Sequence, residues 1–287
     1  MAPVTQLGLV LLATASLATA QRHKGRGLRH SHKKNAQNTK RGCLYISPED
    51  TKVCDILGAG NSGVSWSTNW DSSPDNGAGN LEYIPQLWGG IASNGFDHTT
   101  SWTQNAAAAI KNGATALMGY NEPDNSGQAN MDAAAAFAIW NLVTDFKATN
   151  DITVISPCVT STVTSAGYSG LNWLSEFQSA GAAWDATCVH FYEQCSTLTT
   201  TYDATPLTEF VQKAASQFGK PVWVTEFGCY DNPATEQMGY FLTGAVTALE
   251  NESTCAHYAA FNAGLLVDTA TSSLNVAGQA YVSIASS

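Results

Sequence analysis

The feature that most constrains the fold of this chain is a regular alternation of short strand-like runs with longer helix-like runs. Runs rich in β-branched, aromatic and other apolar residues predict strands at 63–70, 81–88, 114–120, 152–158, 187–192, 221–226 and 258–262. Helix-forming patterns lie between many of them, at 102–111, 131–147, 171–179, 206–218 and 235–250. Alternation of this kind indicates a parallel sheet covered by helices.

A closed barrel fits this alternation better than an open sheet. The main alternative, a doubly wound sheet, normally carries a glycine-rich phosphate-binding motif after a strand, and none follows a predicted strand here. An eighth strand is expected either between Gly89 and Trp102 or near Cys43 to Ile46. We therefore expect an α/β chain with a single (β/α)8 TIM-type barrel, whose function lies at the carboxyl ends of its strands.

The first 41 residues differ from the rest of the chain. Residues 1–20 carry no charge and contain an apolar run followed by small residues, which predicts a secretory signal peptide. Residues 21–41 contain eight of the 13 Lys and Arg, three of the six His and none of the 23 Asp and Glu. This composition predicts a basic disordered arm or a pro-segment cut after Arg41, leaving residues 42–287 as the barrel.

The charge of the predicted barrel excludes several classes of protein. Its five Lys and Arg face 23 Asp and Glu, so it should repel nucleic-acid backbones. No run after Ala20 approaches the roughly 18 apolar residues of a membrane helix. We expect a secreted monomer that binds neither nucleic acid nor membranes.

Seven cysteines, all in the predicted barrel, allow three disulfides with one thiol left over. Cys43 with Cys54, and Cys188 with Cys195, would close short loops, but the sequence leaves the connectivity open. The spacings typical of zinc sites are absent, so we expect no metal and no cofactor.

Two glutamates stand where predicted strands end. Glu122 follows the strand 114–120 in an Asn-Glu-Pro sequence, and Glu226 ends the strand 221–226 before Phe227 and Gly228. In a barrel both would face the same rim. Two carboxyl groups across a sugar ring are the minimum required for glycoside hydrolysis, one to protonate the leaving oxygen and one to attack or to activate water.

The two segments carrying these glutamates resemble the signatures of a known family. Gly119-Tyr-Asn-Glu-Pro-Asp124 and Trp223-Val-Thr-Glu-Phe-Gly228 are similar to motifs of the fungal glycosyl hydrolase catalytic core related to alkali-sensitive linkage proteins, which is glycoside hydrolase family 128, a group of β-1,3-glucanases. Where that family commonly has Tyr and Met, this chain has Thr68 and Gln86. Further matches are Val64-Ser-Trp66, Asn69-Trp70, Leu87-Trp88-Gly89 and Val189-His-Phe-Tyr192.

The resemblance implies a secreted endo-β-1,3-glucanase that cleaves internal bonds of β-1,3-glucan with retention of configuration. Glu122 would be the acid/base, Glu226 the nucleophile, and Asn121 a partner of the sugar 2-hydroxyl. It also implies carboxyl groups about 5–5.5 Å apart. Two alternatives remain open: a non-catalytic β-glucan-binding protein of the cell wall, and a β-glycosidase or transglycosylase of another linkage specificity.

Aromatic side chains near the glutamates fit a sugar-binding cleft, because flat apolar rings stack on the C–H faces of pyranoses. His190 is expected either to orient or modulate Glu226 or to be a hydrogen-bonded structural histidine. Strand alternation is a reason for Tyr120 to point away from the sugar. The residues predicted to bind substrate are Asn121, Trp88, His190, Tyr192, Tyr120 and Trp70.

Overall fold

A computed structural model of the chain describes residues 39–46, 52–91 and 95–286. The predicted signal peptide and nearly all of the predicted arm lie outside these residues. The described residues all belong to one compact unit, Gln37–Ser287.

The main sheet has eight parallel strands in the order β3-β2-β1-β10-β9-β8-β5-β4. They are β1 (Arg41–Leu44), β2 (Val64–Thr68), β3 (Glu82–Tyr83), β4 (Ala116–Met118), β5 (Thr153–Val159), β8 (Ala186–Glu193), β9 (Val222–Cys229) and β10 (Cys255–Ala260).

The two ends of this sheet meet. Gln86, just after β3, forms a parallel bridge with Met118 in β4. Met118 donates its N–H to Pro85 O at 3.0 Å, and Leu87 donates to Met118 O at 3.0 Å. The predicted (β/α)8 TIM-type barrel is thus confirmed, and the carboxyl ends of all eight strands open on one face.

Each predicted strand is present, and β1 supplies the eighth near Cys43. The other position considered for it, between Gly89 and Trp102, is wrong, because only an isolated antiparallel bridge from Ile91 to Asp97 forms there among the described residues. β3 is far shorter than the run 81–88 suggested, since Pro85 has no N–H to donate to a ladder.

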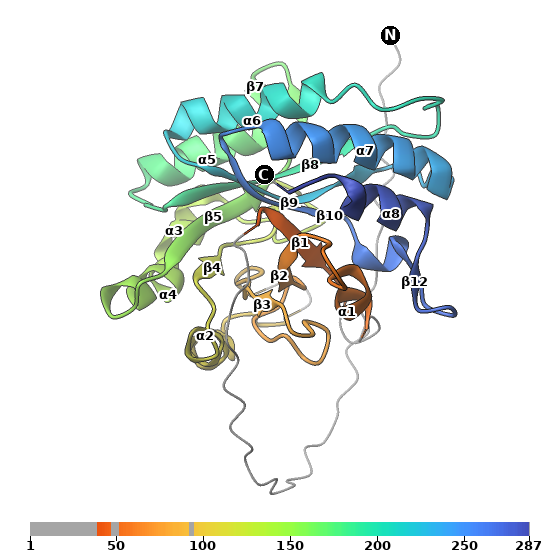
Figure 1. The fold of residues 1–287 in the computed structure, drawn as a ribbon. Helices are drawn as coiled ribbons and strands as arrows, with labels where there is room; N and C mark the ends of the chain where they lie inside the picture. The colour runs from red at the N-terminus through yellow and green to blue at the C-terminus, as the bar shows by residue number, and fades with distance from the viewer. Residues whose placement is uncertain (1–38, 47–51, 92–94, 287) are drawn as a thin grey trace, which may run out of the picture. The chain divides into compact units, whose positions relative to one another are not determined.

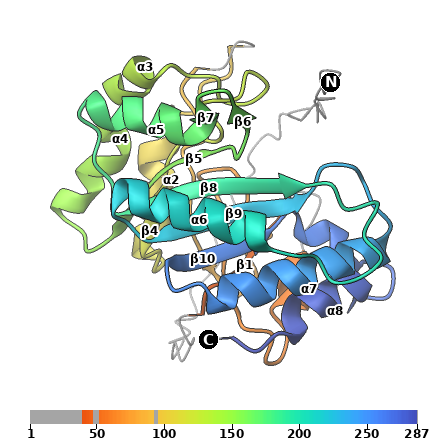
Figure 2. The ribbon, with the colours of Figure 1, turned by 90° about the horizontal axis from the view of Figure 1, so that it is seen from above.

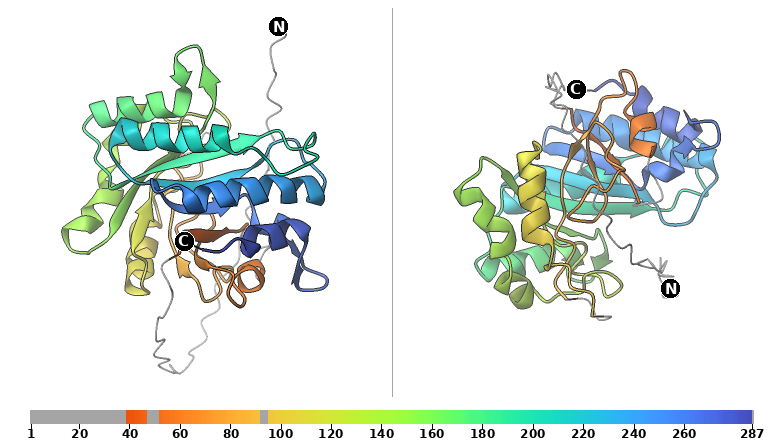
Figure 3. Two further views of the ribbon diagram at one scale, coloured as in Figure 1. Left: turned by 45° about the horizontal axis from the view of Figure 1, so that its top comes forward. Right: turned by 90° about the horizontal axis from the view of Figure 1, so that it is seen from below.

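Helices cover the outside of the barrel (Figures 1 and 2). α5 (Ser169–Ser179) packs on β5, α6 (Thr205–Phe218) on β8 and β9, and α7 (Thr235–Asn251) on β9 and β10. Figure 3 shows the short hairpin of β6 (Val163–Thr164) and β7 (Gly167–Tyr168), in green, standing out from this layer. In the part of the chain that the structure describes, no helix combines the length and apolar character needed to cross a bilayer. The helices are α1 (Val53–Leu57), α2 (Trp102–Lys111), α3 (Ala133–Ala138), α4 (Asn141–Thr144), α5 (Ser169–Ser179), α6 (Thr205–Phe218), α7 (Thr235–Asn251) and α8 (Val276–Ser283), with 3-10 turns η1 (Asp145–Ala148) and η2 (Ala263–Leu265), and a second hairpin of β11 (Val267–Asp268) and β12 (Ser273–Leu274).

The helix predicted over 131–147 is broken into α3, α4 and η1. The break falls at Ile139, whose φ of −117° is not helical. It is followed by Trp140, which is buried against Phe177 and donates its indole N–H to Ala183 O at 3.0 Å. The alanine run itself is helical, in α3, and the break after it coincides with the tertiary packing of this indole, which outweighs local helical propensity there.

The barrel begins one residue earlier than expected, because Arg41 belongs to β1 and is completely buried. Its guanidinium lies 2.8 Å from Glu250 Oε1 on α7 and donates to Tyr258 Oη at 2.9 Å on β10. It also donates to the carbonyl oxygens of Ser62 at 2.7 Å and Ile284 at 2.9 Å. One side chain thus ties β1 to four other parts of the fold.

The basic pair at the end of the predicted arm therefore has a structural role. Lys40 Nζ donates to the carbonyl oxygens of Leu249, Glu250 and Glu252, at the carboxyl end of α7 where the helix dipole favours a cation. Removal of the arm stays a prediction, and a cut after Arg41 would also remove the buried guanidinium.

Three disulfides join six of the seven cysteines, and Cys255 is a buried free thiol. The expected pair Cys43–Cys54 is confirmed. The expected pair Cys188–Cys195 is wrong. Cys188 lies directly opposite Cys158 on the neighbouring strand β5 and bonds to it, whereas Cys195 lies beyond the end of β8 and bonds to Cys229 at the end of β9.

Replacing Arg41 with Met should lower the free energy of unfolding by about 3–5 kcal/mol, because the buried carboxylate of Glu250 would lose its ion pair with Arg41. Urea denaturation followed by circular dichroism measures the change. The matched control is Lys147→Met, since the Lys147–Asp185 ion pair is about half exposed and should contribute less than about 1 kcal/mol. Equal effects of the two substitutions would contradict this role of Arg41.

Candidate active site

Three buried ionisable side chains meet near the carboxyl ends of strands β4, β8 and β9. Glu122 follows β4, His190 lies in β8 and Glu226 lies in β9. Their exposed fractions are 7 %, 1 % and 5 %. Burial of charge on this scale requires each group to have partners.

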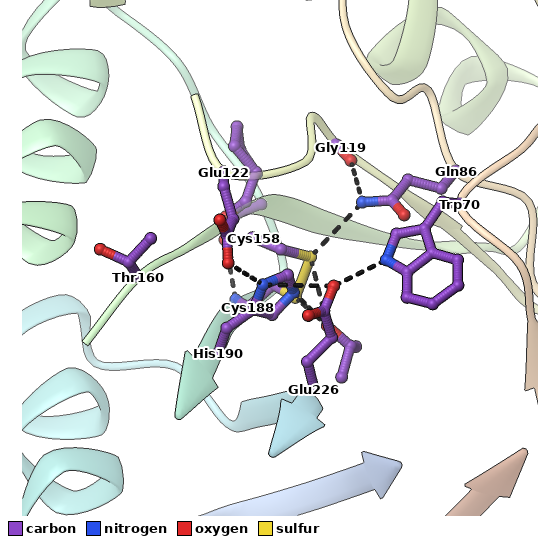
Figure 4. Close-up of a disulfide and its surroundings, with 12 residues drawn as sticks. Trp70, Gln86, Gly119, Glu122, Cys158, Thr160, Cys188, His190 and Glu226 are labelled. Carbon is purple, nitrogen blue, oxygen red and sulfur yellow. Dashed lines mark hydrogen bonds and ion pairs between the residues drawn. A yellow bond between two sulfur atoms is a disulfide. The ribbon is translucent and has the colours of Figure 1, made fainter. Parts of the chain in front are cut away.

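His190 lies between the two glutamates (Figure 4). Its Nδ1 is 2.8 Å from Glu122 Oε1 and 3.4 Å from Glu226 Oε1. One oxygen of each carboxyl group and a ring nitrogen all lie within 4.8 Å of one another. The structure therefore brings together the two glutamates that the sequence placed about 100 residues apart, and their rim position agrees with the prediction.

A left-handed backbone turn presents Glu122. Its φ of 44° is unusual for a residue with a side chain and costs about 1–3 kcal/mol. The turn is held by the Glu122 N–H, which donates to Cys158 O at 2.7 Å, and by Pro123 after it. The amide of Asn125 donates to Glu122 Oε2 at 2.7 Å, so both carboxyl oxygens have a partner.

A β-bulge presents Glu226. Val189 in β8 pairs with Val224 in β9, but the next residue, His190, pairs with Glu226, so Thr225 is an extra residue on β9. Because of the bulge, Thr225 and Glu226 both contact His190, although they are adjacent in the strand. Simple alternation would have sent them to opposite faces.

Two aromatic side chains donate hydrogen bonds to Glu226. Trp70 donates its indole N–H to Oε1 at 2.6 Å, and Tyr192 donates its hydroxyl to Oε2. Trp70 also has a left-handed backbone, with φ of 61°. Both residues were predicted to bind sugar; that contact stays a prediction, and the structure adds that they orient the carboxylate.

Asn121 is buried beside Glu122, and its backbone N–H donates to Trp88 O at 2.8 Å. Its Nδ2 donates to Gln128 Oε1 at 3.1 Å. Its Oδ1 is buried and has no hydrogen-bond partner within the described residues. An amide held at one end and unsatisfied at the other is suited to a polar group of a ligand.

The other two predicted sugar-binding residues behave differently. Trp88 is partly exposed and lies against His98, with ring centroids 4.6 Å apart, so its contact with sugar stays a prediction. Tyr120 is completely buried on the outer side of the barrel, packs against Trp140 and donates to Ala136 O at 2.9 Å. The expectation that Tyr120 binds substrate is wrong, because strand alternation turns it away from the site.

The pKa values of the three central groups are shifted by burial and by one another. Burial would raise the pKa of Glu122, but the hydrogen bond and charge of His190, with the amide of Asn125, bring it below its ordinary value. Burial and the charge of Glu122 raise the pKa of Glu226. The charge of His190 and the hydrogen bonds that Glu226 accepts from Tyr192 and Trp70 lower it, but the net shift is upward. Burial would lower the pKa of His190, but the two glutamates raise it.

These shifts favour the protonated form of His190 and the ionised form of Glu122. The same three side chains offer ligand atoms close enough for one cation. A cation bound there would displace the hydrogen bond between His190 and Glu122, so the arrangement fits proton transfer better than metal binding. The second such group, Cys158, Cys188 and His190, has its two sulfur atoms in a disulfide.

Sequence reasoning missed the residues that support this centre. Asn125 and Gln128 follow Glu122 closely in the chain and carry the polar side chains typical of a loop at a strand end, a signal that was available. Thr225 and the Cys158–Cys188 disulfide had no such signal, because a bulge and a cysteine pairing arise only from the packing of β5, β8 and β9.

Comparisons with known proteins bear on this site. The family described as the glycosyl hydrolase catalytic core matches residues 42–283. Alkali-sensitive linkage protein 1 of Schizosaccharomyces pombe is 27 % identical over 231 residues, which cover 77 % of this chain. The chain spans only 38 % of the length of that relative.

Two solved structures have a similar fold. A curdlan-specific exo-β-1,3-glucanase of glycoside hydrolase family 128, subgroup III, from Blastomyces gilchristii, superposes with a TM-score of 0.70 and 27 % identity over 87 % of this chain and 100 % of that one. A subgroup II endo-β-1,3-glucanase from Sorangium cellulosum gives 0.67 and 31 % over 85 % of this chain and 98 % of that one.

Replacing Tyr192 with Phe should raise the pKa of Glu226 further, because a hydrogen bond to the ionised carboxylate lowers its pKa and would be lost. Titration of the Glu226 carboxyl carbon by ¹³C NMR measures the change. Tyr240→Phe is the matched control, since Tyr240 donates its hydroxyl to a different carboxylate, that of the exposed Glu236, at 2.8 Å. An unchanged Glu226 titration in Tyr192→Phe would show that the hydroxyl does not stabilise the carboxylate.

Proposed function

This chain belongs to the family of the glycosyl hydrolase catalytic core, and we propose that it is a secreted endo-β-1,3-glucanase that acts with retention of anomeric configuration. The family membership and the two glucanases of similar fold support a glycoside hydrolase that acts on β-glucan. The finer points rest on the site itself.

One observation carries the proposal of retention: an oxygen of Glu122 lies within 4.8 Å of an oxygen of Glu226. Retaining glycosidases have their two carboxyl groups about 5–5.5 Å apart, whereas inverting enzymes need about 6.5–9.5 Å to admit a water molecule. The short separation supports direct attack by one carboxylate on the sugar.

The division of roles is proposed from the hydrogen-bond partners of each glutamate and not from their pKa shifts, since the pKa of Glu226 is raised while that of Glu122 is lowered. Glu226 accepts hydrogen bonds from Trp70 and Tyr192, which hold its carboxylate in one orientation for attack on the anomeric carbon. Glu122 serves as the acid that protonates the leaving oxygen. The imidazole of His190, next to it, stores the proton. Water then enters, Glu122 removes its proton, and the glycosyl–Glu226 ester is hydrolysed.

Asn121 completes the site as the partner of the sugar 2-hydroxyl. Its amide is anchored through Gln128, so its position is fixed before the sugar binds. A contact with the 2-hydroxyl strengthens as the ring approaches the oxocarbenium-like transition state.

Secretion and the substrate are proposed on separate grounds. Three disulfides are typical of proteins from oxidising compartments, in agreement with the predicted signal peptide. The choice of internal bonds follows the Sorangium cellulosum enzyme, which is 31 % identical and is an endo-β-1,3-glucanase.

The proposal of retention predicts that a linear β-1,3-glucan gives a β-anomeric product first, read by proton NMR before mutarotation. Glu226→Gln should abolish turnover, and Glu122→Gln should reduce it about 10²–10⁴-fold, the usual contribution of a general acid. Glu193→Gln, at the half-buried carboxyl end of the same β8 strand as His190, is the control and should keep activity.

An α product would contradict the nucleophilic role of Glu226. Absence of any product, with glucan binding retained in a Glu122→Gln/Glu226→Gln double variant, would favour the glucan-binding alternative. Turnover of another β-linked glucan instead would favour the alternative of a different linkage specificity.

The proposal of endo action predicts a rapid fall in the viscosity of soluble β-1,3-glucan while few reducing ends have formed. Chromatography of early products should show a ladder of oligosaccharides. Glucose as the sole early product, with viscosity nearly constant, would instead place the enzyme with exo-acting relatives such as that of Blastomyces gilchristii.

A further inference from the structure

His190 uses only one of its two ring nitrogens to contact the glutamates. The other, Nε2, lies 3.1 Å from the hydroxyl of Thr225, which the β9 bulge turns toward it. That hydroxyl lies 3.0 Å from Cys188 Sγ and 3.5 Å from Cys158 Sγ. The disulfide between these two cysteines thus lies directly behind the imidazole (Figure 4).

The chemistry of the disulfide fixes the direction of these hydrogen bonds. A disulfide sulfur carries no proton, so Thr225 must be the donor in its contacts with Cys188 and Cys158. A threonine hydroxyl has one proton and two lone pairs. With its proton directed at sulfur, the Thr225 hydroxyl offers a lone pair to His190, which matches a proton on Nε2 of the imidazole.

We infer that Thr225, oriented by the Cys158–Cys188 disulfide, is a positioning residue that keeps a proton on His190 Nε2 and so makes the Nδ1 proton the one that His190 passes to Glu122. This inference rests on the proposed function of Glu122 as the general acid. It explains how Glu122 acts as an acid although it is ionised at the start: its proton is stored on the neighbouring imidazole.

The proton transfer balances over one turnover. The Nδ1–H bond of His190 breaks as an O–H bond forms on Glu122 Oε1, which leaves a neutral imidazole protonated on Nε2 and a neutral carboxyl group. Glu122 then gives this proton to the leaving sugar oxygen and becomes a carboxylate again. In the second half, Glu122 takes a proton from the attacking water and returns it to Nδ1.

Without an acceptor at Nε2 this cycle is disfavoured. A neutral imidazole would then keep its proton on Nδ1, donate it to the Glu122 carboxylate and hold that carboxylate ionised. The imidazolium would also lose a hydrogen-bond acceptor and become less stable. The charged groups that act on His190 are Glu122, Glu226 and Asp124, all acidic, and they favour the imidazolium in either case.

A second polar side chain, Gln86, also lies beside the disulfide. Gln86 donates from Nε2 to Gly119 O at 3.1 Å, and the same nitrogen lies 3.9 Å from Cys158 Sγ. Gln86 is the position where the sequence departs from the commoner Met of the related family. The amide of Gln86 is thus a second polar group, besides the Thr225 hydroxyl, beside the sulfur of Cys158.

The test uses ¹⁵N-histidine-labelled full chain, with the ring signals of His190 assigned by comparison with His190→Gln. In the wild type, ¹⁵N shifts should show His190 protonated on Nε2 in both of its charge states. Thr225→Val, which keeps the shape but removes the hydroxyl, should lower the pKa of His190 and move the neutral form to the Nδ1–H tautomer. Thr225→Ser should restore the wild-type pattern.

The same variants should change the pH profile of glucan hydrolysis. Because His190 must be protonated to supply Glu122, a lower pKa of His190 moves the alkaline limb of kcat/KM to lower pH. We expect kcat of Thr225→Val to fall about tenfold or more, the value of one hydrogen bond to a charged group. Thr187→Val is the matched control, since Thr187 is buried on β8 and accepts from Trp184 at 3.1 Å without contacting the site.

The possible results separate this inference from the proposed function. Unchanged ring shifts in Thr225→Val would overturn the inference, whatever the activity. The expected shifts in a wild type that hydrolyses no glucan would leave the tautomer assignment standing and refute both the hydrolase and the proton delivery. If Thr225→Val does not fold, as judged by circular dichroism, the smaller Thr225→Ala carries the same expectations.

Discussion

The arrangement of the site depends on one buried imidazole held between two buried carboxylates. Two glutamates this close in a low-dielectric interior repel each other, and desolvation adds to the cost of ionising both. His190 lies 2.8 and 3.4 Å from their nearest oxygens, and its raised pKa favours a positive charge that offsets this repulsion. The remaining oxygens are satisfied by neutral donors, Asn125 for Glu122 and Tyr192 for Glu226.

Irregular backbone brings these side chains to one point. A regular parallel strand shows every second residue to the barrel interior, which cannot place two consecutive residues against His190. The bulge at Thr225 and the left-handed turn at Glu122 remove that restriction. Both irregularities lie next to the reacting groups, where the surrounding barrel is rigid enough to hold them.

The fold outside the site solves a second problem of buried charge. Arg41 is fully buried at the start of β1 and is balanced by Glu250, with hydroxyl and carbonyl partners for its other donors. This network lies on strands and helices that come together only through tertiary contact. The folded unit therefore includes Lys40 and Arg41, the last basic residues of the segment that its composition predicted to be a disordered arm or a pro-segment.

The sequence by itself determined the barrel and its two glutamates. Alternating strand and helix patterns are local properties, and the carboxyl ends of parallel strands share one face, so Glu122 and Glu226 were predictable as neighbours. Only the tertiary structure decided the bulge at Thr225, the pairing of Cys158 with Cys188 and the burial of Arg41. Each of these depends on the register between strands that are distant in sequence, and register is set by the packing of the whole barrel rather than by any local pattern.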